Sequence, residues 1–391
     1  MKDTSISNAI KYIGVDDKSI ELFENQYIVP NGMAYNSYII KDDKIVIMDT
    51  VDSRAVEQWL ENLTKELGNT KPDYLVISHL EPDHSGGIKL LADKYPEMKI
   101  VGNIKTFTFL PQFVEIENIK ERKVVVNEGD TLNVGNHTLQ FFMAPMVHWP
   151  EVMFTYEQTE KILFSADAFG KFGTLDTEED WACEARRYYF NIVGKYGMQV
   201  QAVLKKLASL EVKTICALHG PILKENLEYY INKYDIWSSY KPEDEGVLVA
   251  YASIHGNTKE AAEKLGEILK QKGAKKVVLA DLVTDDFAET IEDAFRYDKM
   301  IVAASSYNFD VFPPMRNFLY QLKSKGYQNR KVGIIENGTW APSAAKCMRE
   351  IIDEMKNIEV CEPIVTIKTK MNTSTVSNFE NLVENILKGG N

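Results

Sequence analysis

After residue 246, short apolar segments and amphipathic segments alternate without interruption, and few folds accept such a pattern. The apolar segments fit strands that are buried on both faces of a sheet: Val247–Tyr251, Lys276–Leu279, Met300–Ala304, Val332–Ile335 and Ile364–Ile367. Between the first two, Thr258–Lys272 carries apolar residues at i+3 and i+4 spacing, which predicts an amphipathic helix. The pattern predicts a small doubly wound α/β domain, in which ligands bind beyond the carboxyl ends of the strands.

A polar segment at residues 239–246, with Pro242, Gly246 and three acidic residues, precedes this region and is typical of a linker. We therefore expect one domain at residues 1–245 and a second at residues 246–391. The first region alternates short β-branched runs with turns, and Arg54–Leu67 and Gly197–Leu207 show helical patterns. The expected strands indicate a mixed α/β layer structure: Ser37–Ile40, Lys44–Asp49, Tyr74–Ser78, Lys99–Val101, Thr138–Met143 and Ile162–Ser165.

The charge balance limits the classes of partner. Lys and Arg number 45 against 57 Asp and Glu, a formal net charge of −12. Nucleic-acid binders need clustered positive charge, so we expect no nucleic-acid partner. No run approaches the roughly 18 consecutive apolar residues of a membrane span, and the N-terminal residues lack an apolar signal core. The expected location is cytoplasmic, without a membrane partner.

Four potential metal ligands lie within six residues, directly after the predicted strand Tyr74–Ser78. They are His79, Glu81, Asp83 and His84. Pro82 and the pair Gly86-Gly87 would turn this loop so that the four side chains converge. A single histidine at a strand end is more often a hydrogen-bonded loop residue, but four such groups together favour a metal site.

Three further candidates stand at the ends of apolar runs: His148, Asp167 and His219. A ligand placed where a rigid strand ends is held in a fixed position, as metal sites require. His137, by contrast, lies in the turn Gly135-Asn136-His137 and is expected on the surface.

The loop resembles the H-x-[EH]-x-D-H signature of the metallo-β-lactamase fold, and the later candidates follow in the same order. Glu81 makes the donor set harder and more anionic than a histidine-rich zinc site. H-x-E-x-D-H with downstream His, Asp and His is similar to the flavodiiron proteins. The resemblance implies one iron on His79, Glu81 and His148, a second on Asp83, His84 and His219, and a bridge through Asp167. It also implies that His84 is the least secure ligand and that Trp149 and Tyr27 shape the substrate pocket.

A second constellation lies at the strand ends of the later region. The first strand leads into a hydroxyl-rich turn before a helix, where backbone N–H groups can bind a phosphate. The turn matches neither G-x-x-x-x-G-K-[ST] nor G-x-G-x-x-G, which disfavours a P-loop or a Rossmann site. Two further strand ends add amides and the aromatic rings of Tyr307 and Trp340, which could flank a flat ring system. The candidate residues are Ser253, Ile254, His255, Gly256, Asn257, Thr258, Ser305, Ser306, Tyr307, Asn308, Asn337, Gly338, Thr339 and Trp340.

This region resembles a flavodoxin domain that binds FMN. It departs from many flavodiiron proteins at Gly338–Pro342, where those show a Gly-aromatic-x-Gly turn. The combined resemblance implies a metallo-β-lactamase-like αββα sandwich followed by a flavodoxin-like, doubly wound, five-stranded parallel sheet.

The resemblance implies an oxidoreductase with FMN and two non-haem irons per chain. It would reduce dioxygen to water with four electrons, or NO to N2O, or both. The sequence contains no C-x-x-C, so we expect an external donor such as a rubredoxin or a reduced deazaflavin. A head-to-tail homodimer or a dimer of dimers is implied as well. Two rival interpretations stay open: a zinc hydrolase with an accessory flavodoxin domain, and a non-catalytic electron carrier with a vestigial metal fold.

Overall fold

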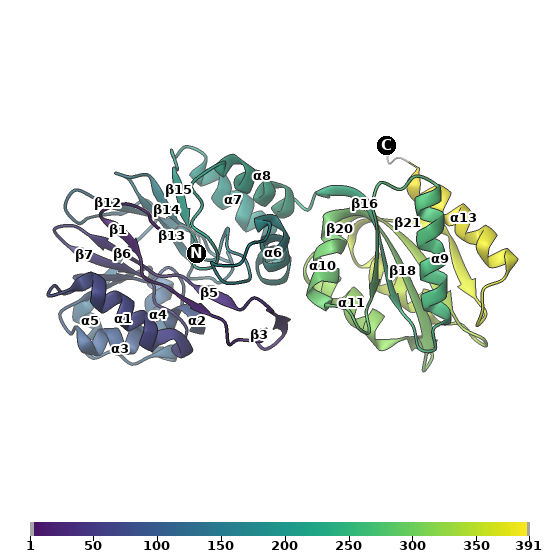
Figure 1. The fold of residues 1–391 in the computed structure, drawn as a ribbon, viewed down its shortest axis with the longest axis horizontal. Helices are drawn as coiled ribbons and strands as arrows, with labels where there is room; N and C mark the ends of the chain where they lie inside the picture. The colour runs from purple at the N-terminus through teal and green to yellow at the C-terminus, as the bar shows by residue number, and fades with distance from the viewer. Residues whose placement is uncertain (1–3, 389–391) are drawn as a thin grey trace. The chain divides into compact units, whose positions relative to one another are not determined.

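The computed structural model describes residues 4–388 and divides into two compact units, residues 1–235 and residues 236–391 (Figure 1). The domain boundary that the sequence predicts, between residues 245 and 246, stays a prediction.

Two sheets form the centre of the first unit (Figure 1). The first sheet has the order β1 (Ile10–Tyr12), β6 (Tyr38–Lys41), β7 (Ile45–Met48), β8 (Tyr74–Val76), β9 (Lys99–Gly102) and β10 (Lys123–Val125). The second has the order β11 (Thr131–Asn133), β12 (Thr138–Met143), β13 (Met153–Glu157), β14 (Ile162–Phe164) and β15 (Thr214–Cys216). Two small two-stranded sheets pair β2 (Val15–Asp17) with β5 (Met33–Tyr35), and β3 (Leu22–Phe23) with β4 (Tyr27–Ile28).

Helices cover the outer faces of both sheets (Figure 1). On the first sheet lie α1 (Val56–Leu67), α3 (Ile88–Lys94), α4 (Ile104–Phe113) and α5 (Ile119–Arg122). Beside the second lie α6 (Trp181–Tyr188), α7 (Gly197–Leu207) and α8 (Leu227–Ser238). Short 3₁₀ turns at Ser53–Ala55 and Gly194–Tyr196 and a π-helical turn at Tyr189–Val193 complete the unit.

The inner faces of the two sheets share one buried core. Tyr38 and Val76 of the first sheet and Phe141 and Phe164 of the second belong to the same hydrophobic cluster. Burying one face of each sheet against the other is what makes a two-sheet sandwich stable. The αββα sandwich implied by the sequence resemblance is confirmed.

The second unit is a parallel sheet in the order β17 (Val277–Asp281), β16 (Asp244–Ala252), β18 (Tyr297–Tyr307), β20 (Gln328–Asn337) and β21 (Lys356–Ile367). The short β19 (Asp310–Val311) pairs with β18 in the antiparallel direction. In chain order this is 2-1-3-4-5, the flavodoxin-like arrangement. All five expected strands are present, and most extend beyond the expected bounds.

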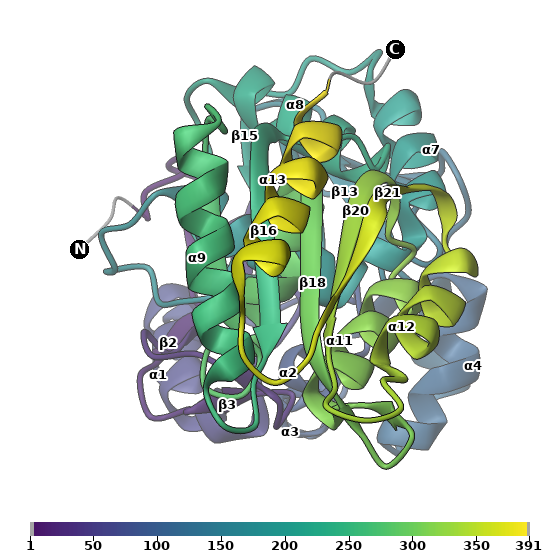
Figure 2. The same cartoon turned by 90° about the vertical axis from the view of Figure 1, so that its right-hand side faces the viewer.

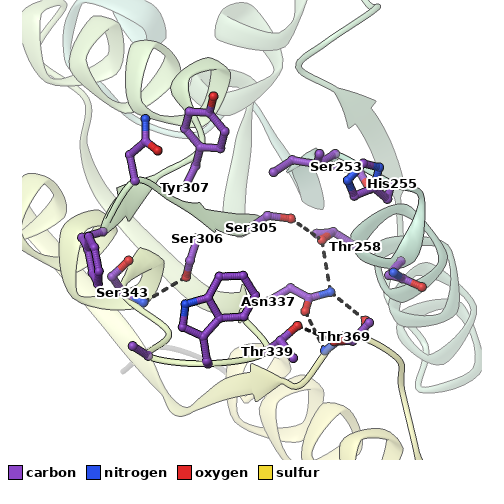
Figure 3. A pocket seen from close by; sticks show the side chains of 17 residues that line it. Ser253, His255, Thr258, Ser305, Ser306, Tyr307, Asn337, Thr339, Ser343 and Thr369 are labelled. Carbon is purple, nitrogen blue, oxygen red and sulfur yellow. Dashed lines mark hydrogen bonds between the residues drawn. The ribbon is translucent and has the colours of Figure 1, made fainter.

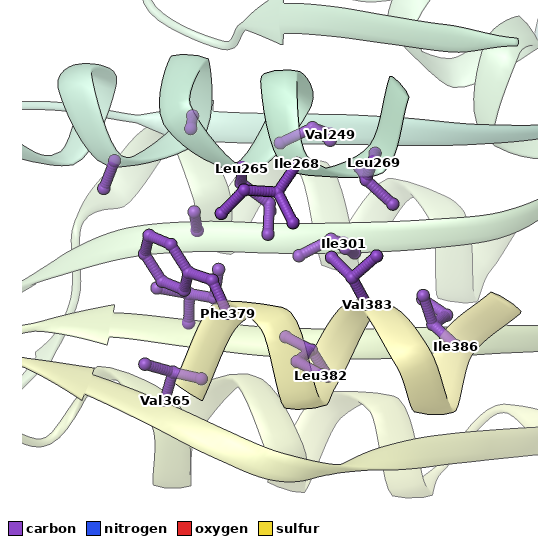
Figure 4. Close-up of a cluster of buried hydrophobic side chains, with 14 of the residues drawn as sticks. Val249, Leu265, Ile268, Leu269, Ile301, Val365, Phe379, Leu382, Val383 and Ile386 are labelled. Carbon is purple, nitrogen blue, oxygen red and sulfur yellow. The ribbon is translucent and has the colours of Figure 1, made fainter. Parts of the chain in front are cut away.

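Helices cover both faces of this sheet (Figure 2). One face carries α9 (Asn257–Gln271) and α13 (Thr373–Leu387), and the other carries α10 (Phe287–Arg296), α11 (Pro313–Ser324) and α12 (Ala344–Asp353). The stripe of α9 predicted from the sequence packs against α13 and the sheet (Figure 4). Leu265, Leu269, Phe379, Leu382 and Val383 are fully buried there, which fixes α9 and the loop that precedes it.

One sequence expectation in the first unit is wrong. His137 is buried, with 7% of its surface exposed, because its two ring nitrogens lie between carboxylates. Nδ1 is 2.6 Å from Asp42 Oδ2 and Nε2 is 3.1 Å from Glu160 Oε1. Ion pairing with residues distant in sequence overrides the turn signal at this position.

Among the helices of residues 4–388, none combines the length and the apolarity that crossing a membrane requires.

Candidate dinuclear metal centre and flavin pocket

All seven candidate ligands lie where strands of the sandwich end. His79 follows β8 after a short link, and Glu81 precedes the helical turn α2 (Pro82–Ser85), which carries Asp83 and His84. Pro82 opens that turn, where its missing N–H leaves no donor unsatisfied. The remaining three ligand candidates follow β12, β14 and β15, as the sequence predicts: His148, Asp167 and His219.

The side chains gather in two sets. In the first, ligand atoms of His79, Glu81, His148 and Asp167 all lie within 4.8 Å of one another. Glu81 Oε2 is 3.2 Å from His79 Nε2 and 3.0 Å from His148 Nε2. In the second set, Asp83, His84 and His219 lie equally close. Imidazole nitrogens and carboxylate oxygens gathered this closely could hold a metal ion in each set.

Asp167 faces both sets. Its Oδ2 is 3.0 Å from His148 Nε2 and 3.4 Å from His79 Nε2. Its Oδ1 is 3.2 Å from His84 Nε2 and 3.8 Å from His219 Nε2. One carboxylate oxygen therefore points to each set, the arrangement of a carboxylate that bridges two metals.

Buried oxygens without donors support a metal rather than a hydrogen-bond network. Both oxygens of Asp167 and both of Asp83 are buried, and none has a hydrogen-bond partner among the described residues. Leaving such atoms unsatisfied would cost each about 1–3 kcal/mol or more. A pair of divalent cations satisfies them, so the donor set of imidazoles and carboxylates fits two irons.

The electrostatics agree with cation binding. Burial would raise the pKa of the Asp167 carboxyl, but His79, His148 and His84 hold that pKa well below its usual value. Burial would lower the pKa of His148, but the Asp167 and Glu81 carboxylates raise it to about 9. Carboxylates and imidazoles that stabilise each other's charge form a site where a metal replaces protons on the histidines.

Two residues outside the ligand set hold the ligand loop. Asp49, at the end of β7, accepts hydrogen bonds from Ser78 N (2.6 Å) and His79 N (3.4 Å). Burial raises the pKa of Asp49 to about 6. Thr50 donates from N (3.2 Å) and from Oγ1 (2.7 Å) to the His84 carbonyl. The end of β7 therefore anchors both halves of the loop.

Glu151 is a buried carboxylate beside the centre that sequence reasoning missed. His79 Nδ1 donates to its Oε1 at 2.7 Å, and Leu80 N donates to the same oxygen at 3.0 Å. Its sequence signal is weak, since it is a single acid three residues after His148 in a loop whose folding brings it behind the His79 ring.

Aromatic rings enclose the centre. Trp149 packs edge-to-face on His79 at 5.1 Å between ring centroids; the pocket role expected for it stays a prediction. The ring of Tyr27 lies 5.9 Å from that of Phe172, and its hydroxyl donates to the Asn191 carbonyl. Phe23, Tyr35 and Tyr188 contact His219, at 5.6, 6.1 and 5.5 Å, and were not expected.

A cavity of about 340 Å³ opens at the carboxyl edge of the second unit's sheet (Figure 3). Thirteen of the fourteen expected flavin contacts line it, and Gly256 does not. Gly256 instead begins α9 in the left-handed conformation, at φ +89°, with no side chain capping the helix. The first N–H groups of α9 are thus left to a ligand such as a phosphate.

Hydrogen bonds between strand ends build the floor of this cavity (Figure 3). Thr258 Oγ1 and Ser305 Oγ are 3.0 Å apart. Asn337 Nδ2 donates to the Thr369 carbonyl, and Thr369 N donates back to Asn337 Oδ1, each at 3.0 Å. Thr369, Ser343, Phe309 and Ala341 also line the cavity and were missed. Phe309 and Ala341 directly follow the expected residues Asn308 and Trp340, whereas Ser343 and Thr369 lie in segments without a motif.

The chemistry of the lining fits FMN. Exposed aromatic rings stand at the mouth, with Trp340 80%, Phe309 82% and Tyr307 46% exposed. Aromatic rings exposed at the mouth of a cavity can stack on a flat ring system bound there. The polar floor offers amide and hydroxyl groups to the edge of a ring system, and α9 offers its N-terminus to one phosphate.

Comparison with known proteins supports the same two-part organisation. Residues 33–220 match the family described as ODP family beta lactamase, and residues 248–380 match the flavodoxin domain. An uncharacterized protein of Methanocaldococcus jannaschii is 31% identical over 320 residues, which cover 80% of each chain. The anaerobic nitric oxide reductase flavorubredoxin of Aliivibrio fischeri is 30% identical over 348 residues, covering 86% of this chain and 69% of that protein.

Solved structures share the fold over nearly the whole chain. Rubredoxin oxygen:oxidoreductase of Desulfovibrio gigas superposes with a TM-score of 0.91 at 24% identity, covering 98% of this chain and 97% of that one. A flavo di-iron protein variant of Thermotoga maritima superposes with a TM-score of 0.88 at 24% identity, covering 97% and 95%. With the two domain matches, the paired ligand sets and the flavin cavity, the chain belongs to the flavodiiron proteins, oxidoreductases that carry a diiron centre and FMN.

Proposed function

We propose that the protein reduces dioxygen to water, nitric oxide to N2O, or both, at a diiron centre that receives electrons through FMN. The observation that carries the proposal is Asp167, whose two oxygens face two separate ligand sets, one of which contains Glu81. Such a centre, joined to a flavodoxin domain, has a redox use and no evident hydrolytic one. The name of the Aliivibrio fischeri relative supports the nitric oxide reaction.

The proposed ligands divide between two irons. His79, Glu81 and His148 would hold the first, and Asp83, His84 and His219 the second, with Asp167 shared. When bound, two ferrous ions and a fully reduced flavin supply four electrons in total. Four electrons and four protons convert one dioxygen to two waters, whereas two electrons and two protons convert two NO to N2O and one water.

The residues of the chain position and shield the reaction. Asp49 and Thr50 hold the loop that carries the first four ligands. Trp149 and Phe23 pack against ligand histidines and restrict water at the centre. Keeping bulk water out strengthens the electrostatic interactions within the site.

Electrons must come from a separate donor. A rubredoxin or a reduced deazaflavin is the proposed donor class, and the exposed aromatic rim of the flavin cavity supports access from outside. We also propose a head-to-tail homodimer, or a dimer of dimers, in which the flavin of one subunit serves the irons of another.

Metal and flavin analysis of the anaerobically purified protein tests the proposal. We expect two irons and one FMN per chain, and consumption of dioxygen or NO when a reduced rubredoxin is supplied. Rates with each gas then establish which reaction dominates. Two zinc ions from iron-replete cells, with no gas consumption, would overturn the proposal in favour of the hydrolase.

A further inference from the structure

The buried carboxylate of Glu151 accepts a hydrogen bond from one ligand histidine, His79. Glu151 and His79 are both completely buried, and His79 Nδ1 is 2.7 Å from Glu151 Oε1. His79 Nε2 points the opposite way, toward Glu81 and Asp167. Because Nδ1 donates to the carboxylate, Nε2 is left with its lone pair directed at the first metal position.

In the second set, the Nδ1 atoms of the histidines have weaker hydrogen-bond acceptors or none. His219 Nδ1 donates to the Ala34 carbonyl at 2.8 Å, a neutral acceptor. His84 Nδ1 is buried and has no hydrogen-bond partner among the described residues. In residues 4–388, neither of these imidazoles has a carboxylate behind it as His79 does.

We propose that Glu151 is a positioning residue that makes the two metal positions unequal, so that the position held by His79, Glu81 and His148 binds metal more tightly. This inference rests on the proposed diiron function. The first metal position should therefore fill before the second, an order that the identity of the ligands alone does not predict.

The negative charge of Glu151 explains why the first position should bind metal more tightly. A carboxylate behind a ligand histidine fixes its tautomer and raises its basicity, and losing such a partner typically costs 10–100-fold in metal affinity. The second oxygen of Glu151, Oε2, is buried without a hydrogen-bond partner in the described structure. A buried negative charge needs a nearby positive one, and His79 with its metal is the group in contact with it.

A purely structural role for Glu151 can be separated from this one. Glu151 Oε1 also accepts from Leu80 N at 3.0 Å and so ties the ligand loop to the segment before β13. Glu151→Gln keeps an acceptor oxygen of the same size for Leu80 N but removes the charge. Anchoring would survive this change, whereas the electrostatic support of His79 would not.

Glu157 offers a matched control. It is also completely buried, and it accepts from Thr159 N at 2.7 Å and Glu160 N at 2.6 Å in a turn after β13. No ligand histidine is hydrogen-bonded to it in the described residues. Glu157→Gln therefore removes a buried charge from the far end of β13, the strand that follows Glu151, without acting on the metal centre.

The test measures metal retention in the full chain. Wild type, Glu151→Gln and Glu157→Gln are loaded with iron-57 and challenged with a chelator, while bound FMN is recorded. We expect wild type to lose one iron readily and to retain the other. Glu151→Gln should release that retained iron 10–100-fold more readily, with FMN unchanged, and Glu157→Gln should behave as wild type. Equal retention of the tighter iron by Glu151→Gln and wild type, or equally fast release of both irons by wild type, would overturn the inference. A wild type without two irons would instead overturn the proposed function.

A second measurement does not depend on the folding of Glu151→Gln. Wild type loaded with one iron per chain should give a single Mössbauer signal. That signal should match the iron retained by His219→Ala, which keeps only the first position. An even mixture of two signals would show that the positions are equivalent and the inference wrong.

Discussion

Replacing Gly86 with alanine should disturb the metal centre through one added methyl group. Gly86 ends the turn that carries Asp83 and His84, in an ordinary helical conformation with φ −59° and ψ −28°. Its Cβ would stand 2.4 Å from Ser53 N and 2.8 Å from the Val51 carbonyl oxygen, both backbone atoms.

The size of the disturbance follows from those distances. An ordinary contact begins near 3.4 Å, so the turn or the facing loop must move by about 1 Å. Overpacking of this kind costs about 1–3 kcal/mol. It outweighs the roughly 0.5–1 kcal/mol that alanine gains over glycine in a helical conformation.

The shift falls on the second metal position. Asp83 and His84 lie within three residues of Gly86, and Thr50 binds the His84 carbonyl to the same loop that the methyl group would push. Metal–ligand distances tolerate deviations of only about 0.2 Å. A movement of about 1 Å should therefore empty the position held by Asp83, His84 and His219.

Iron and FMN per chain, with urea unfolding, measure the outcome. We expect Gly86→Ala to retain about one iron and its full FMN, with stability reduced by about 1–3 kcal/mol. Gly266→Ala is the control, because its Cβ would meet only the Leu279 side chain, at 3.0 Å. Two tightly held irons and unchanged stability in Gly86→Ala would refute the reasoning, since the loop would then absorb the methyl group.

Three other substitutions test separate parts of the structure. His219→Ala should empty one iron position and leave FMN bound, and metal analysis that still finds both irons would remove His219 from the ligand set. Asn257→Glu places a negative charge at the start of α9 and should weaken FMN binding at least tenfold; flavin fluorescence showing tight retention would locate the phosphate elsewhere. Burial would lower the pKa of His137, but hydrogen bonds to Asp42 and Glu160 raise it in the folded protein. The ion pair therefore stabilises the fold fully at a pH below the pKa of the unfolded chain, and this stabilisation is lost as pH rises through the pKa of the folded protein. The stability advantage of wild type over His137→Gln, about 1 kcal/mol, should therefore shrink in urea unfolding as pH rises above the ordinary histidine pKa of about 6.5, and a constant difference would contradict the ion pairing.

Features that depend on neighbours along the chain could be predicted from the sequence. The helical period of Thr258–Lys272 and the apolar run before Ser253 placed α9 and its loop correctly, because each pattern lies within one element. Ligands such as His79 and Asp167 could be found because each follows an apolar strand, and strand ends of a layered sheet meet at common edges.

Only the tertiary structure decided how those residues combine. Asp167, after β14, directs one oxygen to each ligand set, and Glu151 reaches His79 across 72 residues. His137 is buried by carboxylates 95 and 23 residues away, against its local turn signal. Periodicity specifies which face of an element is buried, but charge pairing and metal geometry depend on atoms brought together by sheet packing. That packing is a property of the whole fold and of no single segment.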